Sequence, residues 1–267
     1  MYFLLFLLVG IPKLTYSVPR AEKNKHFANS QNRKPASIGD AKQHIYLTFD
    51  DGPQNGTAVC MELCKKWHVK ATFFMVANHA NSPKMRAIVQ KIKACYPALL
   101  VANHSTDHAG CRYVHFYKNP VAAAADFNEA QQALSVPYKI IRLPGNSAWA
   151  CNNWVKASAL VKPLCNILVN FGYNVVGWDV EWRFNHANSY PIQQPAAMAH
   201  EIENALDANH VHTSKHIVLL AHDRMFRKQR FADSLEKLIA ILKKDPRNVF
   251  ETIDQYPGLK LEKPIKG

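Results

Sequence analysis

Paired carboxylates and spaced imidazoles stand out in this chain because each group comes directly after an apolar segment. They are Asp50 and Asp51, His104 and His108, and His222. One carboxylate with two imidazoles makes a site of three protein ligands, which leaves coordination positions open for a catalytic metal ion. The remaining carboxylate then lies beside the bound water, where it can take a proton. These residue types predict metal-assisted hydrolysis.

The local sequence decides how each group can be presented. Adjacent residues of a strand point to opposite faces, so Asp50 and Asp51 need not share a role. A Gly-Pro pair follows them and forces a sharp turn. His104 and His108 are four residues apart, so in a helical turn both rings face one way and can share one cation.

The elements that position these groups alternate between strand-like and helix-like segments. Short apolar runs predict strands over residues 45–49, 72–76, 99–102, 139–142, 174–178, 216–221 and 249–253. Apolar residues at helical spacing predict helices over residues 57–67, 83–95, 120–134, 154–171, 195–208 and 230–243. About seven β/α alternations demand parallel strands with helices outside.

This pattern predicts an α/β fold, a single-domain, distorted (β/α)7-8 barrel with parallel strands and right-handed crossovers. An open doubly wound sheet is the alternative. Polar residues follow the carboxyl ends of five strands, and catalytic side chains converge at this end of a barrel. The residues that such a barrel would gather are Asp50, Asp51, His104, His108, Arg142, Asp179, His222 and Asp223.

Length and composition exclude several classes of protein. The 267 residues are 48% hydrophobic and 20% charged, which is typical of a globular chain and not of a disordered or fibrous one. No apolar run approaches the roughly 20 residues of a membrane span. The net charge of +13 favours an anionic partner: a glycan, a phospholipid surface or nucleic acid. Because no nucleic-acid-binding motif accompanies the charge, we expect no nucleic-acid partner.

The amino-terminal segment predicts export. Residues 2–9 form a compact apolar block, and Thr15-Tyr16-Ser17 offers the small residues that a signal peptidase reads. No Lys or Arg precedes the block, so an uncleaved anchor and a buried strand remain alternatives. We expect a signal peptide at 1–17, a polar basic linker at 18–42, the domain at 43–255 and a carboxy-terminal tail at 256–267.

The six cysteines include no CxxC pair, so a zinc site made of thiolates is not expected. An exported chain permits disulfides. Cys151 and Cys165 are close in sequence and flank a helix-like stretch, and we expect a bridge between them.

Five short motifs occur in order along the chain. They are Thr48–Pro53 (TFDDGP), His104–His108 (HSTDH), Arg142–Gly145 (RLPG), Asp179–Trp182 (DVEW) and Leu220–His222 (LAH). With these motifs the chain resembles the polysaccharide deacetylases with the NodB homology domain, carbohydrate esterase family 4. The resemblance covers roughly residues 45–253, and the phrases IYLTFDDGP and VANHSxDH look most similar to secreted chitin-oligosaccharide deacetylases.

The resemblance implies a role for each motif residue. Asp50 would be the general base that takes a proton from the attacking water, oriented by an ion pair with Arg142. His222 would be the general acid for the leaving amine, with Asp179 tuning its charge. The implied ligands of zinc, or of another divalent ion such as cobalt, nickel or manganese, are Asp51, His104 and His108. The implied substrate-binding groups are Trp182 and Leu220 at the acetyl group and the backbone N–H of Gly145 at the oxyanion.

The chain departs from the family pattern in two motifs. The third motif usually ends in an aromatic residue that lines the sugar site, whereas Gly145 stands here, and Trp149 is a candidate replacement. The fourth motif carries Glu181 where the family has an aspartate. Both departures concern the fit of the substrate rather than the chemistry.

These observations predict metal-dependent hydrolysis of the N-acetyl group of a GlcNAc-containing glycan, of the peptidoglycan or chitin type, with release of acetate. We expect an exported monomer, periplasmic or secreted, that does not span a membrane. One alternative is an O-deacetylase of xylan or another O-acetylated glycan. The other is a glycan-binding module without catalysis, against which the complete set of motif residues argues.

Overall fold

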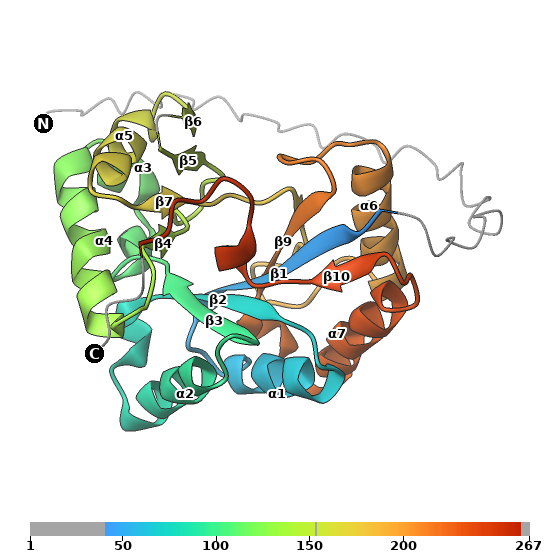
Figure 1. Cartoon of the computed structure of the whole chain (residues 1–267). Coiled ribbons are helices and arrows are strands. Elements are labelled where there is room, and N and C mark those ends of the chain that lie inside the picture. The colour runs from blue at the N-terminus through green and yellow to red at the C-terminus, as the bar shows by residue number, and fades with distance from the viewer. Residues whose placement is uncertain (1–40, 153, 263–267) are drawn as a thin grey trace, which may run out of the picture. The chain divides into compact units, whose positions relative to one another are not determined.

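The computed structural model describes residues 41–152 and 154–262. They form a curled, mostly parallel β-sheet with helices packed along its outer side (Figure 1). The strands are β1 (Gln43–Gly52), β2 (Ala71–Met75), β3 (Leu99–Asn103), β4 (Ile140–Ile141), β5 (Trp149–Cys151), β6 (Trp154–Lys156), β7 (Asn174–Val175), β8 (Val180–Glu181), β9 (His216–His222) and β10 (Asn248–Phe250). The helices are α1 (Thr57–Trp67), α2 (Pro83–Ala94), α3 (Tyr113–Tyr117), α4 (Pro120–Leu134), α5 (Lys162–Asn170), α6 (Pro195–Asp207) and α7 (Gln229–Leu242).

The strand order is β6-β5-β7-β4-β3-β2-β1-β9-β8, with β10 also paired to β1. The order ends at β6 and at β8, so the sheet is a half-barrel, and the prediction of a distorted β/α barrel in one domain is confirmed. The expected signal peptide at 1–17 lies outside the described residues, as does the expected linker up to residue 40. None of the described helices is both long enough and apolar enough to cross a membrane.

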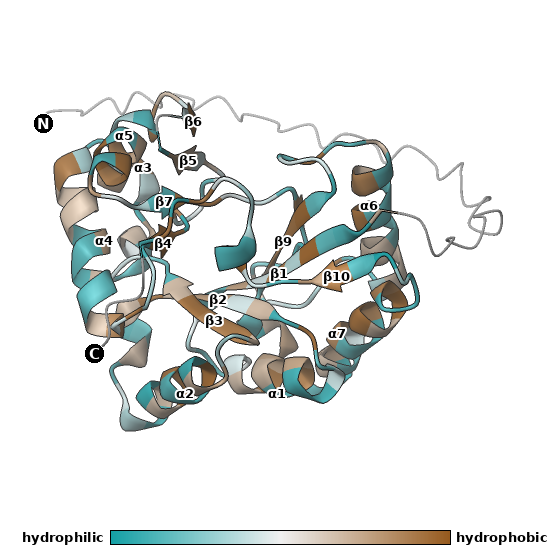
Figure 2. Cartoon of the chain, viewed as in Figure 1, coloured by the Kyte–Doolittle hydropathy of each residue, from teal (hydrophilic) through white to brown (hydrophobic). Residues whose placement is uncertain are grey.

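Both faces of the central strands are buried, which explains their nearly continuous apolar sequence. In β1, Ile45 and Phe49 pack toward α1 and α7, whereas Tyr46 packs on the concave side with Phe74 and Val218. Hydrophobic residues accordingly concentrate on the strands and on the helix surfaces that meet them (Figure 2). This packing fixes the register of β1, because a shift by one residue would exchange its two faces.

Several helices begin where the sequence supplies a cap and a proline. The Ser82 side chain accepts a hydrogen bond from the backbone N–H of Met85 ahead of α2, and Pro83 is the first helical residue. Asn119 and Pro120 make the same start for α4. Proline suits this position because its missing N–H would have no intrahelical partner.

One predicted element is wrong. The helix expected over residues 154–171 begins only at Lys162, and residues 154–156 form β6, which pairs antiparallel with β5. Pro163 stands in the first turn of α5, a position that favours a helix start, and the residues before Lys162 remain free to form strand pairs. The β5–β6 hairpin is therefore an exception to the expected parallel strands.

The carboxy-terminal segment is part of the domain. Tyr256 is buried on the concave side against Tyr46 and Trp149, and Leu259 and Leu261 pack against the same cluster. The boundary expected at residue 255 is therefore too early, and the packed domain runs through the last described residues.

The expected bridge between Cys151 and Cys165 is also wrong, because all six cysteines are free. Cys165 lies on the buried face of α5, while the Cys151 thiol donates to the carbonyl of Gly258 at 3.1 Å. The two thiols thus belong to different parts of the packing.

Candidate active site

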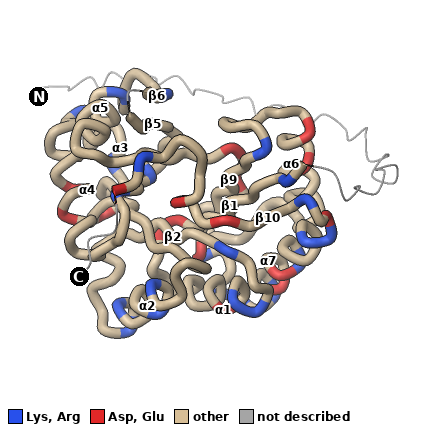
Figure 3. The backbone as a smooth tube through the Cα atoms, in the orientation of Figure 1, with Lys and Arg blue, Asp and Glu red and all other residues tan. Residues whose placement is uncertain are grey.

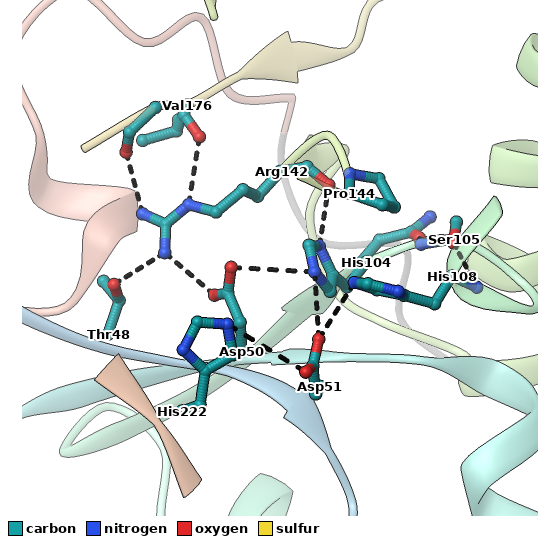
Figure 4. Close-up of polar contacts among 12 residues, drawn as sticks. Thr48, Asp50, Asp51, His104, Ser105, His108, Arg142, Pro144, Val176 and His222 are labelled. Carbon is teal, nitrogen blue, oxygen red and sulfur yellow. Dashed lines mark hydrogen bonds and ion pairs between the residues drawn. The ribbon is translucent and has the colours of Figure 1, made fainter. Parts of the chain in front are cut away.

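The carboxyl ends of β1, β3 and β9 meet on one edge of the sheet because these strands are parallel. β1 ends in the two aspartates, β3 leads into His104, and β9 ends in His222. Figure 4 shows these side chains converging, with the Arg142 guanidinium on the far side of Asp50 from His104 and His108. The structure therefore gathers Asp50, Asp51, His104, His108, Arg142 and His222 at this edge.

The two neighbouring aspartates reach the same site because the strand breaks its regular geometry between them. Asp51 has a φ of 70°, in the left-handed region, and the pairing of β1 with β2 shifts register between Phe49 and Gly52. A regular strand would send the two carboxylates to opposite faces. Here Nε2 of His104 lies 3.6 Å from Oδ2 of Asp50 and 3.5 Å from Oδ1 of Asp51.

Asp51, His104 and His108 form a cluster that fits a divalent metal ion. Their ligand atoms all lie within 4.8 Å of one another, and Nε2 of His108 is 3.0 Å from Oδ1 of Asp51. Nδ1 of His104 lies 2.9 Å from the carbonyl oxygen of Arg142, which can only accept a hydrogen bond. That contact places the proton of a neutral His104 on Nδ1 and leaves Nε2 as a bare acceptor.

A buried atom without a partner supports this interpretation. Oδ1 of Asp51 is enclosed and accepts no hydrogen bond from the described residues. Acceptor atoms that face each other in a buried site repel unless a proton or a cation lies between them. Two imidazoles and one carboxylate are also the donor set of many catalytic zinc sites.

The charged forms of this cluster are coupled. Burial raises the pKa of Asp51, but the imidazoles of His104 and His108 outweigh that effect, and the pKa lies well below its usual range. Burial lowers the pKa of His104, whereas Asp50 and Asp51 raise it, with a net increase. The structure thus keeps Asp51 ionised, as a metal ligand must be.

Arg142 holds Asp50 in place from the other side. Its Nη1 donates to Oδ1 of Asp50 at 2.9 Å and to the Thr48 hydroxyl at 2.7 Å. Its other donors reach the carbonyl oxygens of Val176 and Gly177. Arg142 is fully buried, so its orientation is fixed by these bonds and by the Phe74 ring 4.2 Å from its guanidinium. This geometry orients the free oxygen of Asp50 toward His104.

His222 lies across the site from His104. Its Nε2 is 4.0 Å from Oδ2 of Asp51, and its Nδ1 is buried without a partner among the described residues. The Phe184 ring packs edge-on against the imidazole at 4.7 Å. Burial lowers the pKa of His222 despite the two nearby aspartates. The imidazole is therefore neutral at neutral pH unless it receives a proton in the site.

The structure does not place Asp179 beside His222. Its two carboxylate oxygens accept the backbone N–H groups of His212 and Val218, at 2.6 and 2.7 Å. The carboxylates that act on His222 are those of Asp51 and Asp50. The expectation that Asp179 tunes His222 is thus corrected: Asp179 ties the start of β9 to the loop before β8.

The two expected acetyl-pocket residues differ in position. Leu220 lies on the same face of β9 as His222, two residues away, and pairs in register with Thr48. Trp182 is fully buried, donates its indole N–H to the carbonyl of Gln193, and packs against Phe226. Trp182 therefore belongs to the core between sheet and helices and does not form an open wall of the site.

Gly145 is covered by an aromatic ring from another part of the chain. It has a φ of 61°, and a Cβ there would lie 3.2 Å from the ring of Tyr113. Tyr113 also meets His108 edge-on, and its hydroxyl is 3.4 Å from Nδ1 of that histidine. Trp149, the expected substitute, is instead buried and stacked on His212 at 4.0 Å. The aromatic surface at this site thus comes from Tyr113.

Sequence reasoning missed two further residues at this edge. Arg224 lies 3.3 Å from Oδ2 of Asp51, and its guanidinium covers the Phe184 ring at 4.8 Å. The position of Arg224 two residues after His222 was a usable signal. Phe184 lies in the segment between β8 and α6, and Tyr113 is the first residue of α3; neither residue belongs to a motif.

Comparisons with known proteins agree with this geometry. A family model described as polysaccharide deacetylase matches residues 38–149. The chain is 26% identical to the chitin disaccharide deacetylase of Vibrio alginolyticus, over 81% of this chain and 72% of that one. It is 27% identical to the peptidoglycan-N-acetylglucosamine deacetylase of Bacillus cereus, over 80% and 70% of the two chains.

A solved structure shares the fold. The catalytic domain of a peptidoglycan N-acetylglucosamine deacetylase from Eubacterium rectale superposes with a TM-score of 0.61 at 21% identity, over 88% of this chain and 99% of that one. Together with the motif residues at the strand ends, these matches show that the chain is similar to polysaccharide deacetylases, with the family model covering residues 38–149.

Proposed function

We propose that this protein hydrolyses the N-acetyl group of GlcNAc residues in a glycan and releases acetate. The observation that carries the proposal is the cluster of Asp51, His104 and His108 with Asp50 and His222 on either side. Relatives named for chitin disaccharide and peptidoglycan N-acetylglucosamine support the same substrate class.

Asp51, His104 and His108 would hold the metal ion, and we propose zinc because of the donor set. Such an ion, when bound, polarises the acetyl carbonyl and lowers the pKa of water toward about 7. Asp50, oriented by the hydrogen bond from Arg142, takes the proton from the attacking water. The backbone N–H of Gly145 would donate to the oxygen of the acetyl group as negative charge develops there.

His222 would give a proton to the leaving nitrogen. An amine leaves poorly unless it is protonated, so an acid opposite the base is required. His222 faces Asp51 and lies on the neighbouring strand to Asp50, in direct register with it. Leu220 would contact the acetyl group from the same face of β9.

The test is a product assay. Acetate release is measured from GlcNAc oligomers, peptidoglycan and acetylated xylan, with and without a chelator. We expect release from at least one N-acetylated substrate, loss on chelation, and recovery when Zn²⁺ is added. Release from acetylated xylan alone would assign the site to O-deacetylation, and release that resists complete metal removal would reject the metal-dependent mechanism.

We also propose that the protein is exported, because residues 1–17 have the pattern of a signal peptide. Amino-terminal sequencing of protein from the cell exterior tests this proposal. A mature chain that starts near Val18 supports it, and cytoplasmic protein with Met1 intact contradicts it.

A further inference from the structure

Four cationic side chains follow His222 within eight residues. They are Arg224, Arg227, Lys228 and Arg230, which we call the basic row. The first two lie on or just after the short helix that leaves β9, and the last two lie at the start of α7. The basic row therefore begins at the candidate active site and leads away from it.

Contacts connect each member of the row to the next. Arg224 shares the Phe184 ring with His222, at 4.8 and 4.7 Å. Arg227 donates to the carbonyl oxygen of Arg224 at 2.9 Å and to that of Asn188 at 2.7 Å.

Beyond Arg227, the row gathers around one tyrosine. The Tyr190 ring lies 4.8 Å from the Lys228 ammonium, 5.0 Å from the Arg230 guanidinium and 5.8 Å from that of Arg227. Lys228 and Arg230 are exposed, so the row ends in solvent at a ring surrounded by cations.

Three members of the row, Arg227, Lys228 and Arg230, pair with no carboxylate among the described residues, whereas some cations elsewhere in the protein do. Basic residues occur over several of the outer helices with acidic residues among them (Figure 3). Lys66 pairs with Glu236, Lys70 with Glu251 and Arg183 with Glu201. Within residues 41–152 and 154–262, the one carboxylate paired with the row is Asp51, which contacts Arg224.

A cavity of about 430 Å³ adjoins the row. Arg224 and Arg227 line it, together with amide, hydroxyl and imidazole side chains, and no carboxylate is among its lining residues. Such a set of donors suits an anionic group, because a guanidinium group can donate two parallel hydrogen bonds to a carboxylate or a phosphate. The hydrogen bond from Lys228 and the nearby guanidiniums also lower the pKa of Tyr190, as a positive local potential would.

We propose that the basic row binds negative charges on the glycan, so that the substrate is an anionic acetylated glycan rather than a neutral one. The inference rests on the proposed deacetylase function. A polymer whose acetylated sugar lies between Asp50 and His222 has to extend away from the site. A chain that leaves past Phe184 meets Arg227, Lys228 and Arg230 around the Tyr190 ring.

The experiment measures kcat/KM for acetate release from three GlcNAc-containing oligomers of equal length. One is neutral, one carries carboxylates, and one carries phosphates. The test variant is Lys228→Gln with Arg230→Gln. The control is Lys237→Gln with Lys244→Gln, which removes the same charge from exposed positions on α7 and just after its end.

We expect the wild type to prefer an anionic oligomer, with a preference that falls as salt is added. In the test variant, the ratio of kcat/KM on the anionic oligomer to kcat/KM on the neutral one should fall by roughly 5- to 20-fold, which is the size expected when two exposed ion contacts are lost. The change should appear in KM rather than in kcat. The control should leave both values unchanged. The anionic oligomer whose kcat/KM falls more in the test variant identifies the recognised group as carboxylate or phosphate.

Two outcomes would overturn the inference: a wild type without preference for charge, or an equal loss in test and control variants. Failure of the proposed function gives a different pattern. In that case no oligomer releases acetate. Calorimetric titration of the wild type, the test variant and the control variant with the anionic oligomer then measures binding directly and tests the inference. Binding that weakens in the test variant alone supports the basic row as a glycan site, whereas equal binding by all three proteins rejects it.

Discussion

Asp50 and Asp51 are chemically identical neighbours, yet the structure gives them different surroundings. Asp50 has the Arg142 guanidinium on one oxygen and His104 near the other, whereas Asp51 faces His104 and His108 together. A carboxylate held by a buried arginine can accept a proton, and one between two imidazoles can bind a cation. The division of roles thus follows from contacts that the left-handed turn at Asp51 creates.

His222→Ala separates the acid from the other groups. The variant should lose on the order of 10²–10⁴ in kcat on an acetamide, which is the usual size of general acid catalysis. On an acetate ester with a good leaving group the loss should be much smaller, because that group departs without a proton. Steady-state kinetics on both substrates are the measurement. Equal losses would instead assign His222 to binding or to charge stabilisation.

Asp223 gives a pH dependence of stability. Burial raises the pKa of Asp223 to about 7, although the hydrogen bond from the Thr57 hydroxyl lowers it in part. The folded chain therefore binds a proton that the unfolded chain, with a pKa near 3.9, releases. The stability that this proton contributes is complete below about pH 4 and is lost as the pH rises through about 7.

Asp223→Asn removes this titration. The difference in melting temperature, variant minus wild type, should therefore increase between pH 5 and pH 8, when calorimetry is done on metal-free protein. Expressed as free energy of unfolding, the difference between variant and wild type should change by about 1 kcal/mol per pH unit where it is steepest. A difference that does not change with pH would contradict the raised pKa.

Sequence could name the site residues that occur in motifs, because each motif is short and ends a strand. It could not give the contacts of Asp179 or Trp182, since a side chain's neighbours depend on how distant segments pack. Tyr113 illustrates the same limit. Its ring reaches Gly145 and His108 because α3 folds back across the site, and neither residue's local sequence encodes that contact.

The loop between His104 and His108 is held by a neighbouring helix. Asp126 of α4 accepts the backbone N–H of Thr106 at 2.9 Å, and the Thr106 hydroxyl donates to the Asp126 carbonyl at 2.8 Å. These bonds hold the loop between His104 and His108, the two imidazoles proposed to bind the metal ion. Partners of this kind commonly change metal affinity by 10- to 100-fold.

Asp126→Ala should accordingly weaken Zn²⁺ binding by about 10- to 100-fold, measured by competition with a chelator of known affinity. Asp126→Asn keeps an acceptor for the Thr106 N–H and should have a much smaller effect. Unchanged affinity in the alanine variant would mean that the loop is held by other contacts.

Element boundaries were predictable where sequence signals and packing agree. The helix predicted at 57–67 matches α1, and the predictions for α2 and α4 are within one residue of the structure. The β5–β6 hairpin was not predictable, because residues 154–156 have helical spacing but pair with β5, which is itself held by β7. The short β4 and β7 were likewise expected to be longer.

The half-barrel depends on its last residues. Tyr256 packs against Tyr46 and Trp149 on the concave side and donates to the Thr213 hydroxyl at 2.8 Å. Tyr256→Ala should lower the free energy of unfolding by about 3–5 kcal/mol, the usual cost of removing a large buried ring. Tyr256→Phe should cost about 1 kcal/mol, for one hydrogen bond.

Urea unfolding of these two variants and the wild type is the measurement. Equal stability of the alanine variant and the wild type would show that the segment after residue 255 is a dispensable tail. If the wild type is most stable, Tyr256→Phe slightly less stable and Tyr256→Ala least stable, the domain boundary lies beyond Tyr256.

The central claim is that Asp50 acts on a site whose metal is held by other residues. Metal content and acetate release, measured on the same samples, test it most directly in Asp50→Asn, His104→Ala and the wild type. We predict one ion and full activity for the wild type, and neither for His104→Ala. Asp50→Asn should keep its ion and lose on the order of 10²–10⁴ in rate. Loss of the ion in Asp50→Asn, or acetate release at the wild-type rate, would contradict the account.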